Sequence, residues 1–401
     1  MKTIREIFRI GYGPSSSHTM GPRKAAEIFL ERYANAAKYQ AHLYGSLSAT
    51  GKGHLTDAAI IDVIPSVEIV WHDEFLPFHP NGMRFCAWND RGELLDEWTV
   101  YSVGGGALEE DPDNSIFLIQ KSELPDIYPL SRLSDIKDYC DKMGWDYWEY
   151  VEHYEGKEIW NYLREVWQVM REAVERGLDH EGVLPGPLHL RRKAASYYIK
   201  VAAYRDNLRT RGLVFSYALA VSEENASGGK IVTAPTCGSC GVLPAVLYHT
   251  WRSRDFSETR ILHALATAGL IGNVVKENAS ISGAEVGCQG EVGVACAMAS
   301  AAVNQLFGGT LSQIEYAAEM GLEHHLGMTC DPVCGLVQIP CIERNAFAAA
   351  RALDSNTYAA FSDGSHRVSF DRVVDVMKQT GHDLPSLYKE TSQGGLAKDY
   401  K

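Results

Sequence analysis

The chain has 401 residues, more than one ordinary hydrophobic core accommodates, so its length favours two domains. A net charge of −13, without any block of lysines and arginines, argues against nucleic acid or an anionic membrane as a partner. The N-terminus lacks the apolar stretch of a signal peptide, and the longest apolar run, residues 292–303, is shorter than the roughly 20 residues of a membrane span. We therefore expect a cytoplasmic protein.

Residues 1–130 carry the signals of an α+β domain. A glycine and a proline open a segment over 21–39 that is typical of a short helix. Four apolar runs after it suit β-strands, and turn signals such as "PNG" and "NDRG" separate them. The predicted strands cover residues 41–48, 66–72, 83–88 and 94–103.

The rest of the chain has a helical pattern. Residues 131–157 are aromatic, acidic and low in glycine, and we expect them to form a helical linker. From residue 158 onward, apolar residues recur at three- and four-residue spacing, and neither strand alternation nor a repeat is found. The sequence therefore predicts an all-α domain over 158–401 that carries the functional loops. The predicted helices cover 161–178, 190–229 (as one helix or two), 257–280 and 311–327.

The nine cysteines, an odd number, are too few for a disulfide scaffold and favour thiol, metal or catalytic chemistry. We interpret Cys86, Cys140 and Cys296 as small buried apolar residues. Three segments rich in glycine, proline and cysteine interrupt the helical pattern, and glycine lets a backbone wrap closely around metal-bound thiolates. These segments are 233–245, 282–293 and 329–346, and they contain Cys237, Cys240, Cys288, Cys330, Cys334 and Cys341.

Cysteine spacing alone leaves the kind of site open. The pair Cys237 and Cys240 has the spacing of a structural zinc site, and the pair Cys330 and Cys334 comes close to it. A three-thiolate iron–sulfur cluster is the other option, and it leaves one iron free to act on a substrate as a Lewis acid. The stretch "CGSC" also matches part of the papain-like signature, but Gly241 stands where an aromatic residue follows there, which disfavours a cysteine protease.

Seven stretches of the chain, in order, resemble the iron–sulfur-dependent bacterial L-serine dehydratases in their single-chain form. The resemblance runs from residue 8 to about residue 397, so it spans nearly the whole chain. The stretches are "GYGPSSSHTMGPRKAA", "YGSLSATGKGHLTDAAI", "HPNGMRF", "YSVGGG", "NASISGAEVGCQGEVGVACAMA", "TCDPVCGLVQIPCIERNAFAA" and "ETSQGGLA".

The resemblance implies a [4Fe-4S] cluster held by Cys288, Cys330 and Cys341. It also implies a homodimer, and the conversion of L-serine to pyruvate and ammonia without pyridoxal phosphate. The residues agree with the last point, because no lysine stands in a context that suits a Schiff base, and Lys230 is a weak candidate. In such an enzyme an open iron draws off the substrate hydroxyl while a positioned base takes the α-proton.

Histidines and hydroxyl groups are the expected catalytic and substrate-binding groups. His54 and His79 match motif positions of the family, and histidine titrates near neutrality, so we expect an acid and a base without assigning which is which. A run of hydroxyls before a helix suits the substrate carboxylate, and it would equally serve as a helix cap. This run is Ser15, Ser16, Ser17, His18 and Thr19, and Asn278, Ser280 and Ser282 are expected to line the same pocket.

The sequence leaves the roles of several residues unassigned. The chain ends without the C-terminal cysteine of many single-chain relatives. We expect Cys237, Cys240 and Cys334 to line the cluster pocket, one of them as an alternative fourth ligand. Glu285 and Glu291 are unassigned. The alternative functions are a related lyase acting on L-threonine or L-cysteine, and a zinc-binding or redox-responsive thiol protein without turnover.

Overall fold

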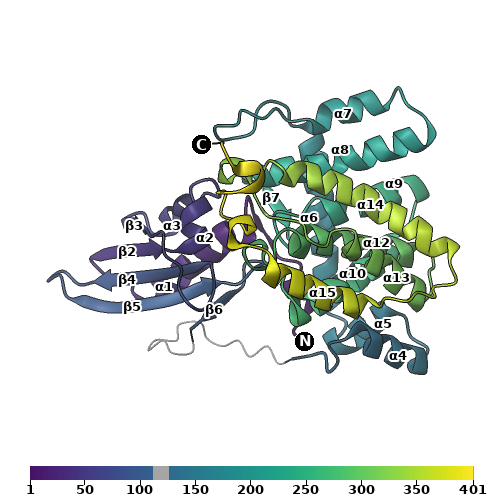
Figure 1. The fold of residues 1–401 in the computed structure, drawn as a ribbon, viewed down its shortest axis with the longest axis horizontal. Helices are drawn as coiled ribbons and strands as arrows, with labels where there is room; N and C mark the ends of the chain where they lie inside the picture. Colours follow the sequence, from purple (N-terminus) through teal and green to yellow (C-terminus); the bar gives the residue numbers. More distant parts are fainter. Residues whose placement is uncertain (112–125, 401) are drawn as a thin grey trace.

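The computed structural model describes residues 1–111 and 126–400, which divide into a sheet region and a mostly helical region (Figure 1). The sheet region is built by the N-terminal part of the chain and lies beside the helices, and the C-terminal tail runs along the junction. Among the described helices, none combines the length and the apolar character needed to cross a membrane. The prediction of an N-terminal part with a sheet and a mainly helical remainder is confirmed in outline.

The described N-terminal part contains a five-stranded sheet, three α-helices and three short elements outside the sheet, namely one strand and two short helices. In chain order its elements are the 3₁₀ helix η1 (Ile4–Glu6), β1 (Ile10–Tyr12), the π-helix η2 (Ser16–Met20), α1 (Gly21–Arg32), β2 (Lys38–Leu43), α2 (Gly45–Thr50), α3 (Thr56–Val63), β3 (Val67–Trp71), β4 (Gly82–Trp88), β5 (Leu94–Ser102) and β6 (Leu108–Glu110).

The sheet has the strand order β3-β2-β4-β5-β6, with β2 and β3 parallel and the other neighbours antiparallel. α1 packs against α3, β4 and β5. Its Phe29 contacts Phe85 of β4 and stacks on Trp98 of β5, with ring centroids 6.2 Å apart in the stacked pair. These aromatic side chains are fully buried, so the sheet region has a hydrophobic core of its own.

The last three of the four predicted strands are confirmed as β3, β4 and β5, but the first is only half correct. The predicted strand over 41–48 ends at Leu43, and a short helix takes up the rest. Gly45 starts that helix with a φ of +55°, and a Cβ atom there would lie 2.4 Å from the carbonyl oxygen of Pro80. A left-handed turn that leaves no room for a side chain therefore ends the strand.

The helical part contains most of the remaining chain. Its elements are α4 (Leu133–Met143), α5 (Tyr147–Glu155), α6 (Ile159–Asp179), α7 (Ala194–Val201), α8 (Asp206–Ala226), β7 (Lys230–Val232), α9 (Val242–Arg254), α10 (Glu258–Asn278), α11 (Gly283–Val286), the π-helix η3 (Gln289–Gly293), α12 (Val294–Leu306), α13 (Leu311–Glu323), the 3₁₀ helix η4 (Val333–Gly335), α14 (Cys341–Phe361), α15 (Phe370–Asp383) and the 3₁₀ helices η5 (Ser386–Tyr388) and η6 (Gly395–Ala397).

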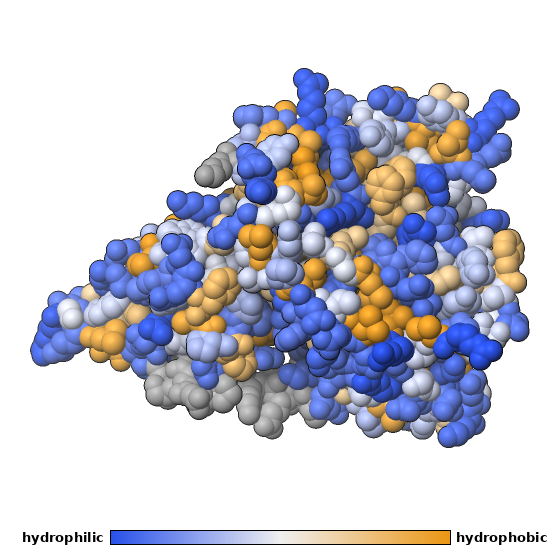
Figure 2. Space-filling model, in the orientation of Figure 1, coloured by the Kyte–Doolittle hydropathy of each residue, from blue (hydrophilic) through white to orange (hydrophobic). Residues whose placement is uncertain are grey.

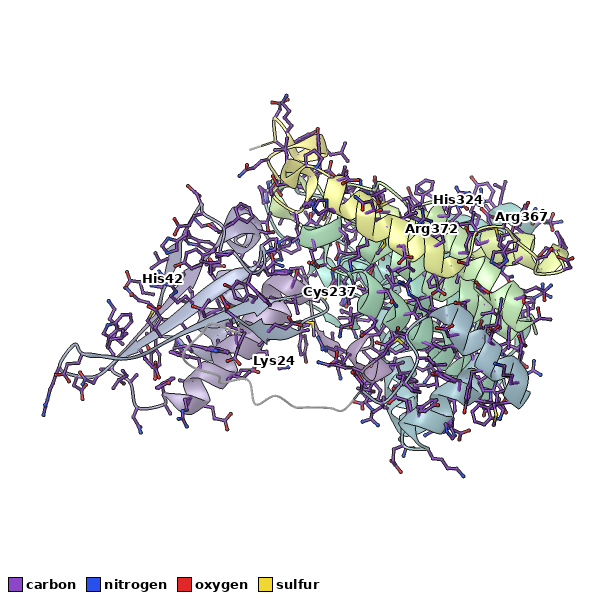
Figure 3. All side chains as sticks on the ribbon, turned by 60° about the horizontal axis from the view of Figure 1, so that its bottom comes forward. Lys24, His42, Cys237, His324, Arg367 and Arg372 are labelled. Atoms are coloured by element: carbon purple, nitrogen blue, oxygen red, sulfur yellow. The ribbon has the colours of Figure 1, made fainter. Side chains whose placement is uncertain are left out.

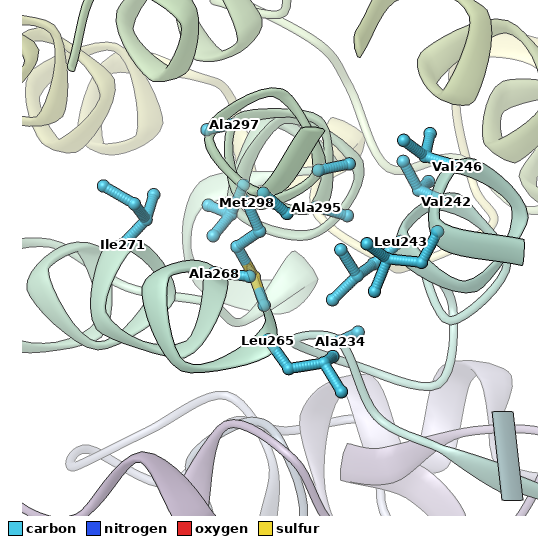
Figure 4. Close-up of a cluster of buried hydrophobic side chains, with 14 of the residues drawn as sticks. Ala234, Val242, Leu243, Val246, Leu265, Ala268, Ile271, Ala295, Ala297 and Met298 are labelled. Atoms are coloured by element: carbon cyan, nitrogen blue, oxygen red, sulfur yellow. The ribbon is translucent and has the colours of Figure 1, made fainter. Parts of the chain in front are cut away.

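The centre of this part is α12, which packs against α9, α10, α13 and α14. Figure 4 shows its Ala295 and Met298 among side chains of α9 and α10, such as Leu243 and Ile271. Small residues let the helices approach closely, since a Cβ atom on Gly321 of α13 would lie 2.9 Å from Cα of Ala297. The apolar run at 292–303 is thus a buried central helix.

The prediction that the second part is all-α is wrong at one short strand. β7 pairs antiparallel with β1, and Ile10 lies opposite Val232. The residues before β1 also belong to the helical side, because Ile4, Ile7 and Phe8 are buried in its core cluster. The pairing therefore anchors the beginning of the chain to the helices that carry the cysteine loops.

The segment predicted as a linker, 131–157, is helical, as expected, and forms α4 and α5. Both helices contribute buried residues to the core of the helical part, among them Ile136, Tyr147 and Tyr150. These residues therefore pack as an integral part of the helical core. The domain boundaries themselves stay a prediction, and the stretch 112–125 that leads to the first boundary lies outside the described residues.

The contact between α6 and α8 predicts a stability defect. A Cβ atom on Gly177 of α6 would lie 2.3 Å from the carbonyl oxygen of Ala220 and 2.8 Å from its Cα. Gly177→Ala should therefore lower the free energy of unfolding by about 1–3 kcal/mol, although alanine is the better helix former. Urea unfolding followed by circular dichroism measures this change. Glu165→Ala, at an exposed position of the same helix, is the control, and equal stability of the two variants would contradict the prediction.

Candidate active site

Three of the nine cysteines meet at one largely enclosed cavity where the two regions join. Cys288 precedes η3, Cys330 precedes η4, and Cys341 is the first residue of α14. All three are buried, and they line the same small cavity. Figure 3 marks the place with Cys237, because its neighbour Gly238 lines the cavity.

Glycine provides the room around these thiols. A Cβ atom on Gly283 would lie 3.2 Å from Sγ of Cys330 and 2.6 Å from Oε2 of Glu291. A Cβ atom on Gly238 would lie 3.2 Å from Oε1 of the same glutamate. Larger residues at either position would displace Glu291 or the thiol, so the close approach accounts for part of the glycine content of these loops.

Glu291, unassigned from the sequence, lies among the thiols. Its Oε2 is 3.9 Å from Sγ of both Cys288 and Cys330, and these three ligand atoms lie within 4.8 Å of one another. The Thr236 hydroxyl donates a 2.8 Å hydrogen bond to Oε1. Burial nevertheless raises the pKa of the carboxyl group above its usual value. Glu285, by contrast, accepts a hydrogen bond from the Ser280 hydroxyl and lines a neighbouring open pocket.

The Cys288 thiol and burial disfavour ionisation of the other two thiols. The hydrogen bond that the Cys330 thiol shares with Cys288, and then burial, raise the pKa of the Cys330 thiol well above its usual value. Burial and the proximity of Cys288 do the same to the pKa of Cys341. One cation lies close: burial opposes the charge of Arg344, but the three cysteines raise the pKa of its guanidinium. Three buried thiols of this kind become thiolates when a metal centre supplies positive charge, and the donor set therefore fits a metal or cluster.

The hydroxyl run at the N-terminal end of η2 borders the same cavity. Ser15 lines it and caps η2, since its Oγ accepts a 3.1 Å hydrogen bond from the backbone N–H of His18. Thr19 donates a 2.6 Å hydrogen bond to the carbonyl oxygen of His54, which ties this turn to the loop before α3. Ser16 receives a longer hydrogen bond, 3.5 Å, from the backbone N–H of Cys237. The run is therefore a helix cap and a wall of the cavity at once.

His54 lines the cavity in a defined tautomer. Its Nδ1 lies 3.0 Å from the Thr50 hydroxyl, which donates its own proton to the carbonyl oxygen of Ser46 at 2.9 Å. Thr50 therefore accepts from Nδ1–H, and Nε2 of His54 keeps its lone pair. Burial, and then the nearby His18, lower the pKa of His54 well below its usual value, so the ring is neutral.

Both ring nitrogens of His18 form hydrogen bonds, so neither has a free lone pair. The Ser46 hydroxyl donates to the carbonyl oxygen of Glu390 at 2.7 Å, so it accepts from Nε2–H of His18 at 3.1 Å. Nδ1 of His18 then accepts from the Ser17 hydroxyl at 2.9 Å. Burial lowers the pKa of His18 to about 3. His18 is therefore a neutral structural link between the N-terminal part and the C-terminal tail.

The structure does not bring every predicted residue to the cavity. His79 is buried nearby, but its side chain does not line the cavity; its Nδ1 accepts from the backbone N–H of Asn81, and Nε2 has no partner among the described residues. Asn278 donates to the carbonyl oxygens of Ser131 and Val274 and so fixes the end of α10. The Ser282 hydroxyl is buried behind the cavity wall without a hydrogen bond within the described ranges.

Three further cysteines also lie outside the cavity lining. Cys237 and Cys240 are buried in the helical core, and Sγ of Cys237 contacts Sδ of Met20 at 3.5 Å. Cys334 sits in η4 with a φ of +55°, against the loop of Gly53. Among the described residues, none of the three joins a group of metal-ligating atoms. The zinc site suggested by their spacing is therefore not formed by this arrangement.

A residue that sequence reasoning missed completes the cavity. Glu390 lies in the stretch "ETSQGGLA", which belongs to the family resemblance but whose residues have no role predicted from the sequence. The tail runs beside Cys330, whose carbonyl oxygen accepts from the Glu390 backbone N–H at 2.7 Å. Burial, and then Glu291 and Cys288, raise the pKa of Glu390 well above its usual value, although the backbone N–H of Ala284 favours the ionised form.

Comparison with known proteins gives a consistent result along the whole chain. Residues 34–397 match the family described as serine dehydratase alpha chain, and residues 3–64 match the serine dehydratase beta chain. The L-serine dehydratase TdcG of Escherichia coli is 42% identical, over 98% of this chain and 98% of its own length. The L-serine dehydratase of Streptomyces coelicolor is 40% identical over 98% of both chains, and that of Helicobacter pylori is 35% identical over 100% of this chain and 99% of its own.

The buried, neutral His54 predicts a pH-dependent contribution to stability. Its pKa is lowered only in the folded chain, so below about pH 6.5 the unfolded chain binds a proton that the folded chain excludes. Acidification below that pH costs the wild type up to about 1.4 kcal/mol of unfolding free energy per pH unit through this residue. The stability difference between wild type and His54→Gln should therefore narrow between pH 6.5 and 5, as measured by urea unfolding of the cofactor-free protein.

The matched control is His382→Gln, which removes an exposed imidazole from α15. Its stability difference from the wild type is expected to change little over the same pH range. A difference for His54→Gln that stays constant with pH would show that the imidazole is accessible to protons in the folded chain.

Proposed function

The chain belongs to the serine dehydratase family, and from this premise we propose that it converts L-serine to pyruvate and ammonia. The observation that carries the proposal is the convergence of Cys288, Cys330 and Cys341 from three separate loops on one buried cavity. His54 and Ser15 border the same cavity from the N-terminal part. A cavity with thiols on one wall and an imidazole and a hydroxyl on the other suits a small, polar substrate.

We further propose that Cys288, Cys330 and Cys341 hold a [4Fe-4S] cluster. The raised pKa values of the Cys330 and Cys341 thiols, the nearby Arg344 and the space left by the glycines support a positively charged cluster over three free thiols. When bound by three thiolates, such a cluster supplies one open iron, a Lewis acid for the substrate hydroxyl. Among the described residues that line the cavity, none is a lysine.

In this proposal His54 is the base and His79 the acid. Nε2 of His54 carries the lone pair and its ring is neutral, so it can take the α-proton of serine, while the β-hydroxyl leaves as water with a proton donated by His79. The aminoacrylate that forms tautomerises to an imine, which water hydrolyses to pyruvate and ammonia. His18 cannot serve in its place, because hydrogen bonds engage both of its ring nitrogens.

The substrate carboxylate is assigned to the N-terminal end of η2. Ser15 lines the cavity there, beside the first backbone N–H groups of the helix. Ser16, Ser17 and Thr19 hold this turn against neighbouring segments. His79 stays a predicted proton donor: its Nδ1 accepts a hydrogen bond, so its proton is on Nε2, which has no partner within the described ranges.

Removal of a single ligand cysteine tests the reaction and the cluster together. Protein purified without air should contain iron and sulfide, show the broad visible absorbance of an iron–sulfur cluster, and release pyruvate from L-serine. Cys288→Ala, Cys330→Ala and Cys341→Ala should each abolish pyruvate release and lower the iron content. Cys86→Ala, which changes a buried cysteine of the sheet, is the control. A colourless wild-type protein that holds stoichiometric zinc would contradict the proposal.

We also propose that two copies of the chain associate through the exposed face of α14 and α8. Phe347, Tyr358 and Phe361 project from α14, where Phe361 is 89% exposed, and Leu208 is exposed on α8 beside them. Figure 2 shows apolar residues exposed among polar ones on the helical part of the molecule. Large apolar side chains exposed on neighbouring helices are typical of a protein interface.

The interface is tested by a charge placed at its most exposed side chain. Phe361→Glu should convert a dimer of the wild type to a monomer, as measured by light scattering after size-exclusion chromatography. Leu94→Glu, at an exposed apolar position of the distant sheet, should leave the mass unchanged. A monomeric wild type, or a dimeric Phe361→Glu variant, would contradict this assignment.

A further inference from the structure

Glu390 presents a buried carboxyl oxygen to the cavity without any partner. The residue is 6% exposed and lines the cavity together with the three cysteines. Its Oε2 has no hydrogen-bond partner among the described residues. An unpaired buried carboxyl group is unfavourable, so the native structure retains it at a cost that a ligand can relieve.

The carboxyl group also lacks a charged donor within the described ranges; the backbone N–H of Ala284, which favours its ionised form, is a neutral one. The nearest basic nitrogen to Oε1 is Nδ1 of His18, at 3.6 Å. That nitrogen accepts the Ser17 hydroxyl and therefore has no proton to offer. Within residues 1–111 and 126–400, no lysine or arginine forms an ion pair with Glu390. The group is placed to accept hydrogen bonds, and the described protein supplies none to Oε2.

None of the described residues that line the cavity is a lysine or an arginine. Glu291 is a second carboxyl group facing it, and across the described residues it too forms no ion pair. Arg344 is engaged elsewhere, because its Nη1 donates to the carbonyl oxygen of Thr329 at 2.7 Å and its Nη2 lies 3.5 Å from Asp331. A small ligand that complements this wall carries a cation with several N–H donors.

We infer that Glu390 binds the α-ammonium group of the amino-acid substrate. This inference rests on the proposed function, which assigns the substrate carboxylate to Ser15 and the α-proton to His54 and leaves the ammonium group without a partner. A carboxylate that accepts N⁺–H hydrogen bonds in a buried site gives strong, charge-dependent binding. Glu390 would thereby select amino acids over hydroxy acids of the same size.

The backbone of Glu390 is fixed in a way that suits this role. Its φ of +58° is uncommon for a residue with a side chain, and the surrounding contacts hold it there. The backbone N–H donates to the carbonyl oxygen of Cys330, and the carbonyl oxygen accepts from the Ser46 hydroxyl, each at 2.7 Å. The carboxyl group is therefore positioned by both halves of the protein.

The test compares two inert ligands that differ only at the α-substituent. L-alanine carries the ammonium group and L-lactate a hydroxyl, and neither has a β-hydroxyl to eliminate. Calorimetry on the cluster-containing wild type should show tighter binding of L-alanine. In Glu390→Gln the dissociation constant of L-alanine should rise roughly 10- to 100-fold, while that of L-lactate changes by less than about threefold. In the same variant, the KM for L-serine should rise along with the dissociation constant of L-alanine.

Two further variants make the outcome decisive. Glu390→Asp keeps the charge and should bind L-alanine more tightly than Glu390→Gln does. Glu343→Gln, at an exposed carboxyl on the helix that begins with Cys341, is the matched control and should behave as the wild type. Iron content and visible absorbance establish that each variant holds its cluster.

The inference is overturned if Glu390→Gln weakens both ligands equally, or if it leaves the L-alanine constant and the KM for L-serine unchanged. It is also overturned if the wild type binds L-lactate as tightly as L-alanine. Failure of the proposed function has a different signature, because the wild type would then release no pyruvate from L-serine at any concentration.

Discussion

Five acidic groups share one buried cavity, and the electrostatic cost of that arrangement explains the rest of the site. Three thiols and two carboxyl groups cannot all ionise there without positive charge. The raised pKa values of Cys330, Cys341, Glu291 and Glu390 express this constraint. The cavity therefore suits cationic occupants, in agreement with the metal centre proposed for the thiol side and the ammonium group proposed for the side of the tail.

The groups can be held so close because rigid elements hold each of them. Cys341 begins α14 and Cys288 borders η3, and both of these helices pack on the alanine-rich α12, while glycines keep the space beside the thiols clear. The imidazole of His54 is oriented by Thr50, and the neighbouring His18 by Ser17 and Ser46. Neither region alone encloses the cavity, since Ser15 and His54 come from one and the thiols from the other.

Much of the fold could be predicted from local patterns, and the failures have physical causes. The strands of the sheet and the amphipathic α6 have the periodicity expected of half-buried elements. α12 and α9 lack it, because they are buried on nearly every side and have no polar face. α14 was not predicted, because its first residue, Cys341, belongs to a stretch rich in cysteine and proline that is typical of a loop.

The candidate site likewise contains residues that could be predicted from the sequence and residues that could not. The three cysteines proposed as ligands could be selected because long motifs resemble a family, whereas spacing alone also allowed a zinc site. Glu390 could not be found, because its position depends on contacts with Ser46 and Cys330, far from it in the chain, and its tail has no periodic pattern. Glu291 was seen but unassigned, since only the folded loops show that its carboxyl group lies between two thiols.

The hydrogen bond between Ser46 and Glu390 joins residues 344 positions apart, and this separation has a consequence for how the protein acquires its site. Contacts of such high sequence separation form late, because the entropy of closing a long loop must be overcome first. No local folding unit contains the complete cavity. A partly folded chain therefore leaves its thiols open to oxidants and stray metals, and only the last docking steps enclose them.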